Sequence, residues 1–414
     1  MSTRPPLSPT PLGLEPTFGF GDRLGLATPG HLDAVRRHAG PIRPIFAQQS
    51  IREMQRTGRS AAQVLAAAEA ALAAEGYVRP WGADGDHLKT PADVDTVARA
   101  GFTFFTIDPS DHVDAHADDD DATALDAKFA RVRDAAPWAS HYEGRTVRVG
   151  DGLEIHFDRT TVRRAVVKYG RAIAHSLALA TYIGEVMAAA GRAYELELSV
   201  DETPQPTTPA EHYIIADRFR EAGVRLVSLA PRYVGDFEKG VDFRGDVAAF
   251  ERCLAQHAAI AAELGPYKLS LHSGSDKLSI YSAFARITRG RFHVKTAGTS
   301  YLEALRVVAR HDAPLFRKVV ALARERFETD RASYHISAEL GRIPAGQALG
   351  DVDLERVYLD EDAGRQVLHV TFGSVLTRPG LRDAIRAVLA AEPATHRDVL
   401  ADHLGKHLIA LRGG

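Results

Sequence analysis

Short apolar segments alternate with longer helical segments from about residue 17 to residue 310 of this 414-residue chain. Eight of them have the length and patterning of strands, at residues 22–27, 42–48, 78–83, 102–107, 194–200, 225–230, 267–271 and 292–296. Between them lie stretches with apolar residues at helical spacing, such as 61–75 and 248–263. Strand–helix alternation requires right-handed crossovers and a parallel sheet, so eight units predict an α/β fold, a closed (β/α)8 barrel of the TIM type.

One connection departs from the strand–helix alternation. After the fourth strand, the segment from about residue 112 to about residue 190 is too long for a single crossover. This insertion contains a hairpin at 145–157 that turns at Gly150-Asp151-Gly152, followed by a long helix over about 160–190. An insertion after a strand lies on the active face of a barrel, so we expect it to form a lid.

The remaining domain boundaries follow from this pattern. Residues 1–16 are predicted to be an extended lead-in, and residues 17–310 the barrel with its insertion. Residues 311–414 are predicted to be a mainly helical C-terminal extension with one strand at 366–372. This extension could flank the barrel or pair with a second subunit in a homo-oligomer.

Composition excludes several functional classes. The 51 basic and 54 acidic side chains nearly balance, and no basic stripe with interleaved aromatic residues occurs, so nucleic-acid binding has no support. We find no apolar run near the roughly 20 residues that cross a bilayer, and no signal sequence among residues 1–16. The single cysteine, Cys253, excludes an internal disulfide and indicates a reducing, cytoplasmic setting.

Polar residues follow the carboxyl ends of most of the predicted strands, whereas the strands themselves are largely apolar. In a barrel the carboxyl ends of all strands meet at one mouth, where chemistry gathers. The seventh strand is the most informative, because His272, Ser273, Ser275, Asp276 and Lys277 follow it directly. A metal ligand, hydroxyls, a carboxylate and an ammonium on one rigid support suit a polyhydroxylated, anionic small molecule.

Two histidines and a carboxylate on this rim match the 2-His-1-carboxylate pattern, which leaves coordination positions open for substrate. We expect His87, Glu202 and His272 to hold one divalent cation, with Zn, Mn, Ni, Co and Mg all open. Asp201 competes with Glu202, because strict alternation would point Asp201 inward if the strand continued. His293 is a further candidate that should lie deeper in the barrel.

Several long segments resemble the tagaturonate/fructuronate epimerase family. They are GADGDHLKT at 82–90, FTIDPSDH at 105–112, SVDET at 199–203, VSLAPRYVGDFEKG at 227–240, KLSLHSGSDK at 268–277, FHVKTAGTSYLEA at 292–304, LHVTFG at 368–373 and HLGKH at 403–407. The similarity covers nearly the whole chain. It implies a metal-dependent enzyme that interconverts D-tagaturonate and D-fructuronate, and related proteins also act on the neutral ketohexoses fructose and tagatose.

The two keto-acids differ at a hydroxyl-bearing carbon whose hydrogen the ketone does not acidify. Retro-aldol cleavage and re-addition can invert that carbon, and so can oxidation and reduction by a nicotinamide. The chain offers a metal site and no dinucleotide fingerprint following a strand, which favours the retro-aldol route. The expected acid–base pair is Asp86 and Asp201, with Glu202 as a substitute.

The remaining polar residues of the rim are assigned to substrate binding. The candidates for the substrate carboxylate are Lys89, Arg232 and Lys295, and those for its hydroxyls are Gln48, Asp108 and Asp276. Three alternatives stay open: a Schiff-base aldolase built on Lys295, a metal-dependent sugar-acid aldolase that releases its fragments, and a non-catalytic sugar-acid binding protein.

Overall fold

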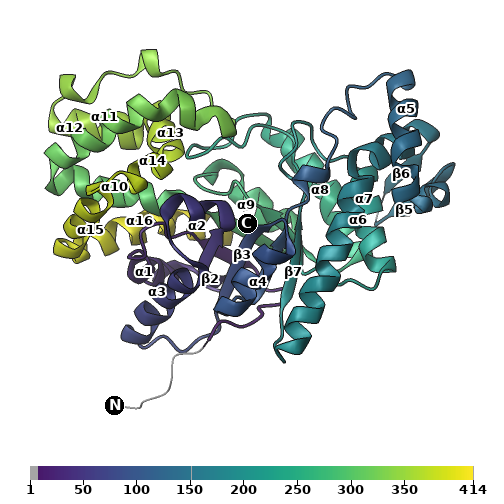
Figure 1. Ribbon diagram of the computed structural model, residues 1–414, viewed down its shortest axis with the longest axis horizontal. Coiled ribbons are helices and arrows are strands. Elements are labelled where there is room, and N and C mark those ends of the chain that lie inside the picture. The colour runs from purple at the N-terminus through teal and green to yellow at the C-terminus, as the bar shows by residue number, and fades with distance from the viewer. Residues whose placement is uncertain (1–7, 151, 414) are drawn as a thin grey trace.

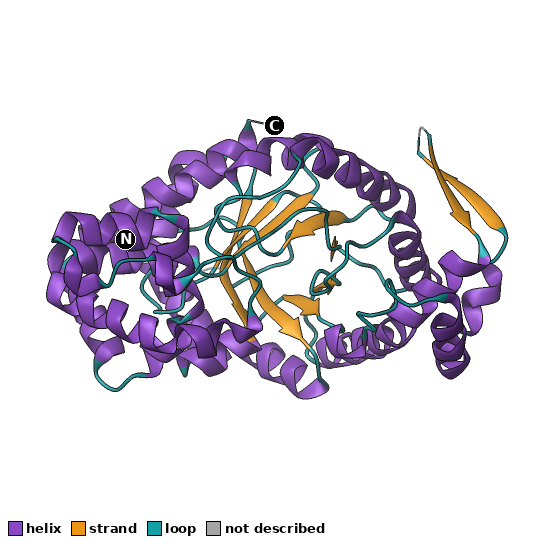
Figure 2. Ribbon diagram, turned by 90° about the horizontal axis from the view of Figure 1, so that it is seen from above, coloured by secondary structure: helices purple, strands orange, loops and turns teal. Residues whose placement is uncertain are grey.

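The computed structural model describes residues 8–150 and 152–413. Eight parallel strands form a closed barrel. In order around the barrel they are β1 (Thr17–Phe20), β2 (Arg43–Ser50), β3 (Gly82–Leu88), β4 (Phe104–Ile107), β7 (Glu195–Ser199), β8 (Ser228–Ala230), β9 (Lys268–Leu271) and β10 (Phe292–Thr296). β10 pairs with β1 to complete the circle. Figure 2 shows these strands enclosed by a ring of helices. The predicted (β/α)8 barrel is confirmed.

Two predicted strands are misplaced. The first strand is Thr17–Phe20 rather than 22–27, because the Asp22 carboxylate accepts hydrogen bonds from the backbone N–H groups of Leu24, Gly25 and Ala27 and holds that segment as a loop. The third is Gly82–Leu88 rather than 78–83. Its polar residues are part of the strand because the barrel interior is itself charged at this mouth, as described below.

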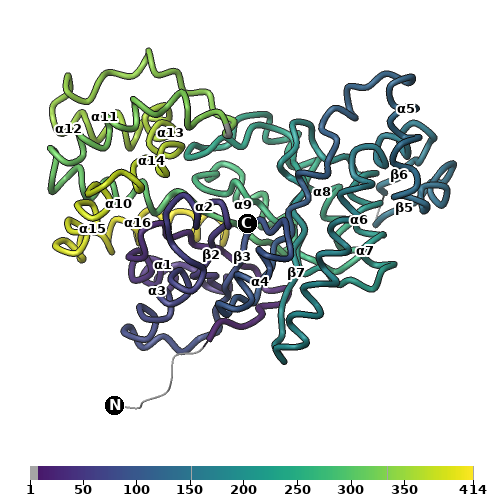
Figure 3. The backbone as a smooth tube through the Cα atoms, in the orientation of Figure 1, coloured from purple at the N-terminus to yellow at the C-terminus, as the bar shows by residue number. Residues whose placement is uncertain are grey.

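The wall of helices is completed by the C-terminal end of the chain. α10 (Thr299–His311) follows β10 and leads away into the C-terminal region, whereas α16 (Pro393–Arg412) packs against both α1 (Thr28–His38) and α9 (Leu278–Ile287). Its buried leucines at 400, 404, 408 and 411 belong to the same hydrophobic core as the barrel. Figure 3 shows this yellow C-terminal segment beside the purple first helix.

The rest of the C-terminal region forms a second helical core beside the barrel (Figure 1). Its helices are α10 together with α11 (Ala313–Asp330), α12 (Asp351–Glu355), α13 (Asp362–Val370), α14 (Phe372–Thr377) and α15 (Leu381–Ala391). The strand predicted at 366–372 is wrong, because these residues belong to α13 and α14. Leu368 and Phe372 are fully buried four residues apart, so packing against α11 overrides the local β-branched composition.

The insertion after β4 lies on the opposite side of the barrel from this helical core (Figure 1). The predicted hairpin is confirmed as β5 (Arg145–Val149) and β6 (Leu153–Phe157), although Asp151 of its turn lies outside the described residues. α6 (Arg159–Ala189) then returns to the barrel. By length and hydropathy α6 could cross a membrane, contrary to our expectation, but its buried Lys168 pairs with Asp118 at 2.7 Å inside the folded chain.

Candidate active site

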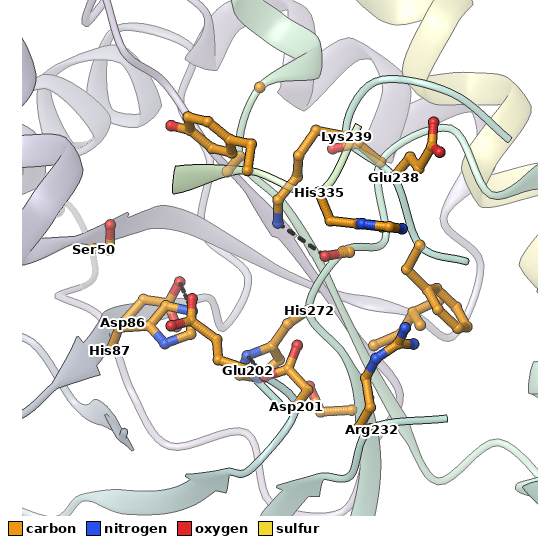
Figure 4. A pocket seen from close by; sticks show the side chains of 18 of the residues that line it. Ser50, Asp86, His87, Asp201, Glu202, Arg232, Glu238, Lys239, His272 and His335 are labelled. Carbon is orange, nitrogen blue, oxygen red and sulfur yellow. Dashed lines mark hydrogen bonds and ion pairs between the residues drawn. The ribbon is translucent and has the colours of Figure 1, made fainter. Parts of the chain in front are cut away.

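One cavity of about 550 Å³ opens at the mouth formed by the carboxyl ends of the strands. Side chains at the carboxyl ends of β2 and β3 and on the loops after β7, β8 and β9 line it (Figure 4). The C-terminal region supplies Tyr334, His335 and His369 to the opposite wall, and of these only His369 lies in a segment, 368–373, that carried the family resemblance. No described residue of the 112–190 insertion lines the cavity.

Beneath the cavity, one ammonium group is surrounded by carboxylates. Lys295 Nζ lies 2.7 Å from Asp84 Oδ2, 2.7 Å from Asp86 Oδ1 and 2.8 Å from Glu197 Oε1, and the side chain is 1% exposed. Burial would lower the pKa of Lys295, but the three carboxylates raise it well above its usual range. Lys295 is therefore a protonated structural cation, which removes it as a carboxylate binder and disfavours it as a Schiff-base nucleophile.

His87 and His272 meet above this charged layer, each oriented by a buried carboxylate. His87 Nδ1 lies 3.2 Å from Asp108 Oδ2, and His272 Nε2 lies 2.5 Å from Glu197 Oε1. These contacts use one ring nitrogen of each histidine, and the buried Nδ1 of His272 has no hydrogen-bond partner. A carboxylate behind each imidazole is the usual support of a metal-binding histidine.

Asp86 completes a set of three candidate metal ligands. One ligand atom from each of Asp86, His87 and His272 lies within 4.8 Å of the others. Burial would raise the pKa of Asp86, but His87 and Lys295 hold it well below its usual range, so this carboxylate is ionised. His87 has a φ of 53°, an uncommon backbone conformation for a residue other than glycine. Burial would lower the pKa of His87, but Asp86 and Asp108 raise it to about 10, so a cation must displace a proton from this ring. With that proton lost, the two imidazoles and the Asp86 carboxylate fit a divalent cation.

The predicted ligand Glu202 lies at the rim rather than within this set. It groups with His87 and Asp108, its side chain is 37% exposed, and Arg52 pairs with it at 3.4 Å. No candidate group among the described residues joins Glu202 with His272. Asp201 also lies at the rim, where Oδ1 accepts a 2.6 Å hydrogen bond from Ser199 Oγ and lies 3.5 Å from His272 Nδ1.

The other predicted residues divide between the cavity and its surroundings. Gln48 and Arg232 line the cavity, and Gln48 Nε2 donates to Asp86 Oδ2 at 3.3 Å. Lys89 lies outside the cavity lining, where it pairs with Asp111 at 2.7 Å. His293 is buried deep in the barrel beside Thr17 Oγ1, at 2.9 Å, as expected.

Asp276 and Lys277 lie behind the cavity wall. Asp276 binds Arg365 at 3.0 Å and His403 at 2.6 Å, so it belongs to an ion-pair network and not to the cavity lining. Lys277 is fully buried and donates to the backbone carbonyls of Glu238 and Ser275. Sequence reasoning missed Lys239 of the cavity wall, although it lies within the segment 227–240 that carried the family resemblance.

Comparison with known proteins agrees with this architecture. A family model of tagaturonate epimerases (UxaE) matches residues 3–411. A tagaturonate/fructuronate epimerase of Thermotoga maritima is 42% identical over 409 residues, which cover 99% of this chain and 83% of that protein. Crystal structures of a fructuronate-tagaturonate epimerase from Cohnella laeviribosi, native and with one glycerol, each superpose with a TM-score of 0.91 at 41% identity, covering 98% of this chain and 83% of that one. The chain therefore belongs to the tagaturonate epimerase family.

Proposed function

We propose that this protein is a divalent-metal-dependent epimerase that interconverts D-tagaturonate and D-fructuronate by retro-aldol cleavage and re-addition. Family membership supports the substrate class, because the Thermotoga and Cohnella relatives carry both sugar acids in their names. The observation that carries the chemistry is the cluster of Asp86, His87 and His272, with Asp108 and Glu197 behind the two rings. A cytoplasmic location and a homo-oligomeric state stay predictions.

The cation would be held by Asp86, His87 and His272, with Glu202 able to approach from the rim. A bound divalent cation supplies Lewis acidity that polarises the substrate ketone. Nitrogen and oxygen donors accept Zn, Ni, Co and Mn, and Mg remains open. Asp86 belongs with the ligands rather than with the acid–base groups, because the Lys295 ammonium 2.7 Å away helps to hold its pKa well below the usual range, and a carboxylate that stays ionised is a poor proton carrier.

The reaction then needs one proton acceptor beside the inverted carbon. In ketose numbering the ketone is C2, the inverted carbon is C4 and the carboxylate is C6. Asp201 or Glu202 removes the O4 proton, the C3–C4 bond breaks, and its electron pair enters the enediolate of the C1–C3 fragment. After the C4 aldehyde turns over, the enediolate attacks its other face and the same carboxyl group returns the proton to O4.

Asp201 is the better placed base on present geometry. Its side chain is 19% exposed, so it reaches both the cavity and water, and the Ser199 hydroxyl orients it. Glu202, which pairs with Arg52 at the rim at 3.4 Å, is the alternative base. Single Asp201→Asn and Glu202→Gln variants distinguish them, since loss of the base lowers kcat about 100-fold or more.

The test uses enzyme depleted of metal with EDTA and reconstituted with single cations, offered fructuronate and fructose side by side. We expect activity to disappear on depletion and to return with at least one divalent ion, and His272→Ala to prevent that return. Full activity in both depleted enzyme and His272→Ala would disprove the metal proposal. Release of three-carbon products instead of the epimer would identify an aldolase, and binding without turnover a sugar-acid binding protein.

The fate of the carbon-bound hydrogen tests the route. Retro-aldol cleavage leaves the C4 hydrogen in place, so the product formed in deuterium oxide should carry no deuterium at C4. Deuterium at that carbon would exclude both the retro-aldol route and the nicotinamide route.

A further inference from the structure

Lys239 reaches into the cavity from the loop that follows β8. Its Nζ donates a 2.8 Å hydrogen bond to the hydroxyl of Ser273, which lies on the loop after β9. Both residues line the cavity. Figure 4 shows this contact as a dashed line on the side of the cavity away from Asp86 and His87.

The Lys239 ammonium has no anionic partner among the described residues, because its acidic neighbours bind elsewhere. Glu238 accepts hydrogen bonds from Gln366 Nε2 at 2.6 Å and from Ser337 Oγ at 2.8 Å. Asp236 lies 3.4 Å from His335. Within the part of the chain that the structure describes, no carboxylate oxygen lies within 4.0 Å of Lys239 Nζ. A half-buried, uncompensated ammonium in a cavity is suited to an anionic ligand.

The arginines at the cavity are already engaged, and Arg52 pairs with Glu202 at 3.4 Å. Arg23 forms a close pair with Glu53 at 2.6 Å and stacks on Phe372. Arg232 Nη1 donates to the backbone carbonyls of Tyr233 at 2.8 Å and Gly235 at 2.9 Å, so it shapes its own loop. Lys239 is thus a better carboxylate site than Arg232, which the sequence had suggested.

The fold holds this position in place before substrate arrives. The buried Lys277 ammonium donates to the carbonyls of Glu238 and Ser275, and so joins the loop of Lys239 to the loop of Ser273. His369, which is 3% exposed, packs its ring against Gly240, the residue after Lys239. Pre-positioned groups lose less conformational entropy on binding, which strengthens recognition.

We propose that Lys239, together with the Ser273 hydroxyl, binds the substrate carboxylate and retains the three-carbon aldehyde acid while the C3–C4 bond is broken. This inference rests on the proposed function. Cleavage leaves the carboxylate, C6, two bonds from the aldehyde carbon, C4. Rotation about C4–C5 therefore turns the aldehyde over while the carboxylate stays on Lys239, and the C1–C3 fragment stays at the Asp86, His87 and His272 cluster.

The binding test does not depend on turnover. D-gluconate, a six-carbon hydroxy acid, and D-sorbitol, its uncharged analogue, are titrated calorimetrically into the wild type, Lys239→Met, Lys239→Arg and Arg232→Met. We expect Lys239→Met to weaken gluconate binding about 10- to 100-fold without weakening sorbitol binding, and Lys239→Arg to restore most of it. A loss under 3-fold in Lys239→Met, or a larger loss in Arg232→Met, would overturn the assignment.

The kinetic test addresses fragment retention. With fructuronate, Lys239→Met should raise KM about 10- to 100-fold and release dihydroxyacetone at least 10-fold faster per epimerisation event than the wild type. Unchanged release would overturn the retention role. Failure of the proposed function would give a different result. The wild type would then epimerise neither fructuronate nor tagaturonate, while Lys239→Met would still bind gluconate more weakly than the wild type.

Discussion

The rings of His87 and His272 meet edge to face at the mouth of the barrel, with centroids 5.4 Å apart and planes at 89°. They come from β3 and from the loop after β9, which lie on different sides of the barrel circle. The metal hypothesis requires both rings to lie close together at one mouth of the barrel, and they do. Because a carboxylate holds each ring, substitutions of these carboxylates should also change metal binding.

Asp108→Asn tests this supporting layer. Because the amide cannot hold His87 Nδ1 as strongly as the carboxylate does at 3.2 Å, we expect metal affinity to fall about 10- to 100-fold. Chelator competition measures the change. Asp111→Asn is the matched control, since Asp111 is 67% exposed and lies outside the cavity lining. Equal metal affinity in Asp108→Asn and the wild type would contradict the supporting role.

Lys295→Met should strongly destabilise the barrel. Asp84, Asp86 and Glu197 would lose their common cation in a buried site, and breaking such a pairing costs about 3 to 5 kcal/mol. The free energy of unfolding from urea titration gives the value. Lys89→Met, which removes a partly exposed ion pair, should cost less than about 1 kcal/mol. A borohydride-trapped substrate adduct at Lys295 would instead support a Schiff-base role.

The pH dependence of stability should change in His403→Gln. Burial would lower the pKa of His403, but Glu303 and Asp276 raise it above its unfolded value of about 6.5. The protonated ring therefore stabilises the fold fully below about pH 6.5, and this contribution declines as pH rises through the higher folded-state pKa.

We expect His403→Gln to lose about 3 kcal/mol at pH 6, and less at higher pH. Urea titrations at several pH values check this, with the exposed His156→Gln as control. A deficit that grows with pH would mean that His403 is neutral in the folded protein.

Leu404→Ala tests whether α16 belongs to the barrel wall. Leu404 is fully buried in the barrel core, so the cavity left by alanine should cost about 2 to 5 kcal/mol in the free energy of unfolding. Ile409 lies on the same helix and is 53% exposed, so Ile409→Ala should change stability by about 0.5 kcal/mol or less. Similar effects of both substitutions would show that α16 does not close the ring.

The hydrophobic pattern alone determined the architecture, because alternating strands and helices of this length have few ways to bury both faces of a parallel sheet. It placed β10 at the observed residues, and it placed His87, Asp201 and His272 at one mouth. It failed at β3, where Asp84 and Asp86 interrupt the apolar pattern that identifies a strand.

Tertiary structure decided which polar residues act together. Asp86 and Lys295, which are 209 residues apart in the chain, meet with Asp84 and Glu197 in one charge cluster, so Lys295 is not available to bind the substrate carboxylate. A network with Arg365 and His403 holds Asp276 outside the cavity. Lys239 can bind an anionic ligand because the neighbouring carboxylates of Glu238 and Asp236 bind Gln366 and His335 of the C-terminal region instead. The ionic partner of a side chain depends on three-dimensional proximity, which local sequence patterns do not encode.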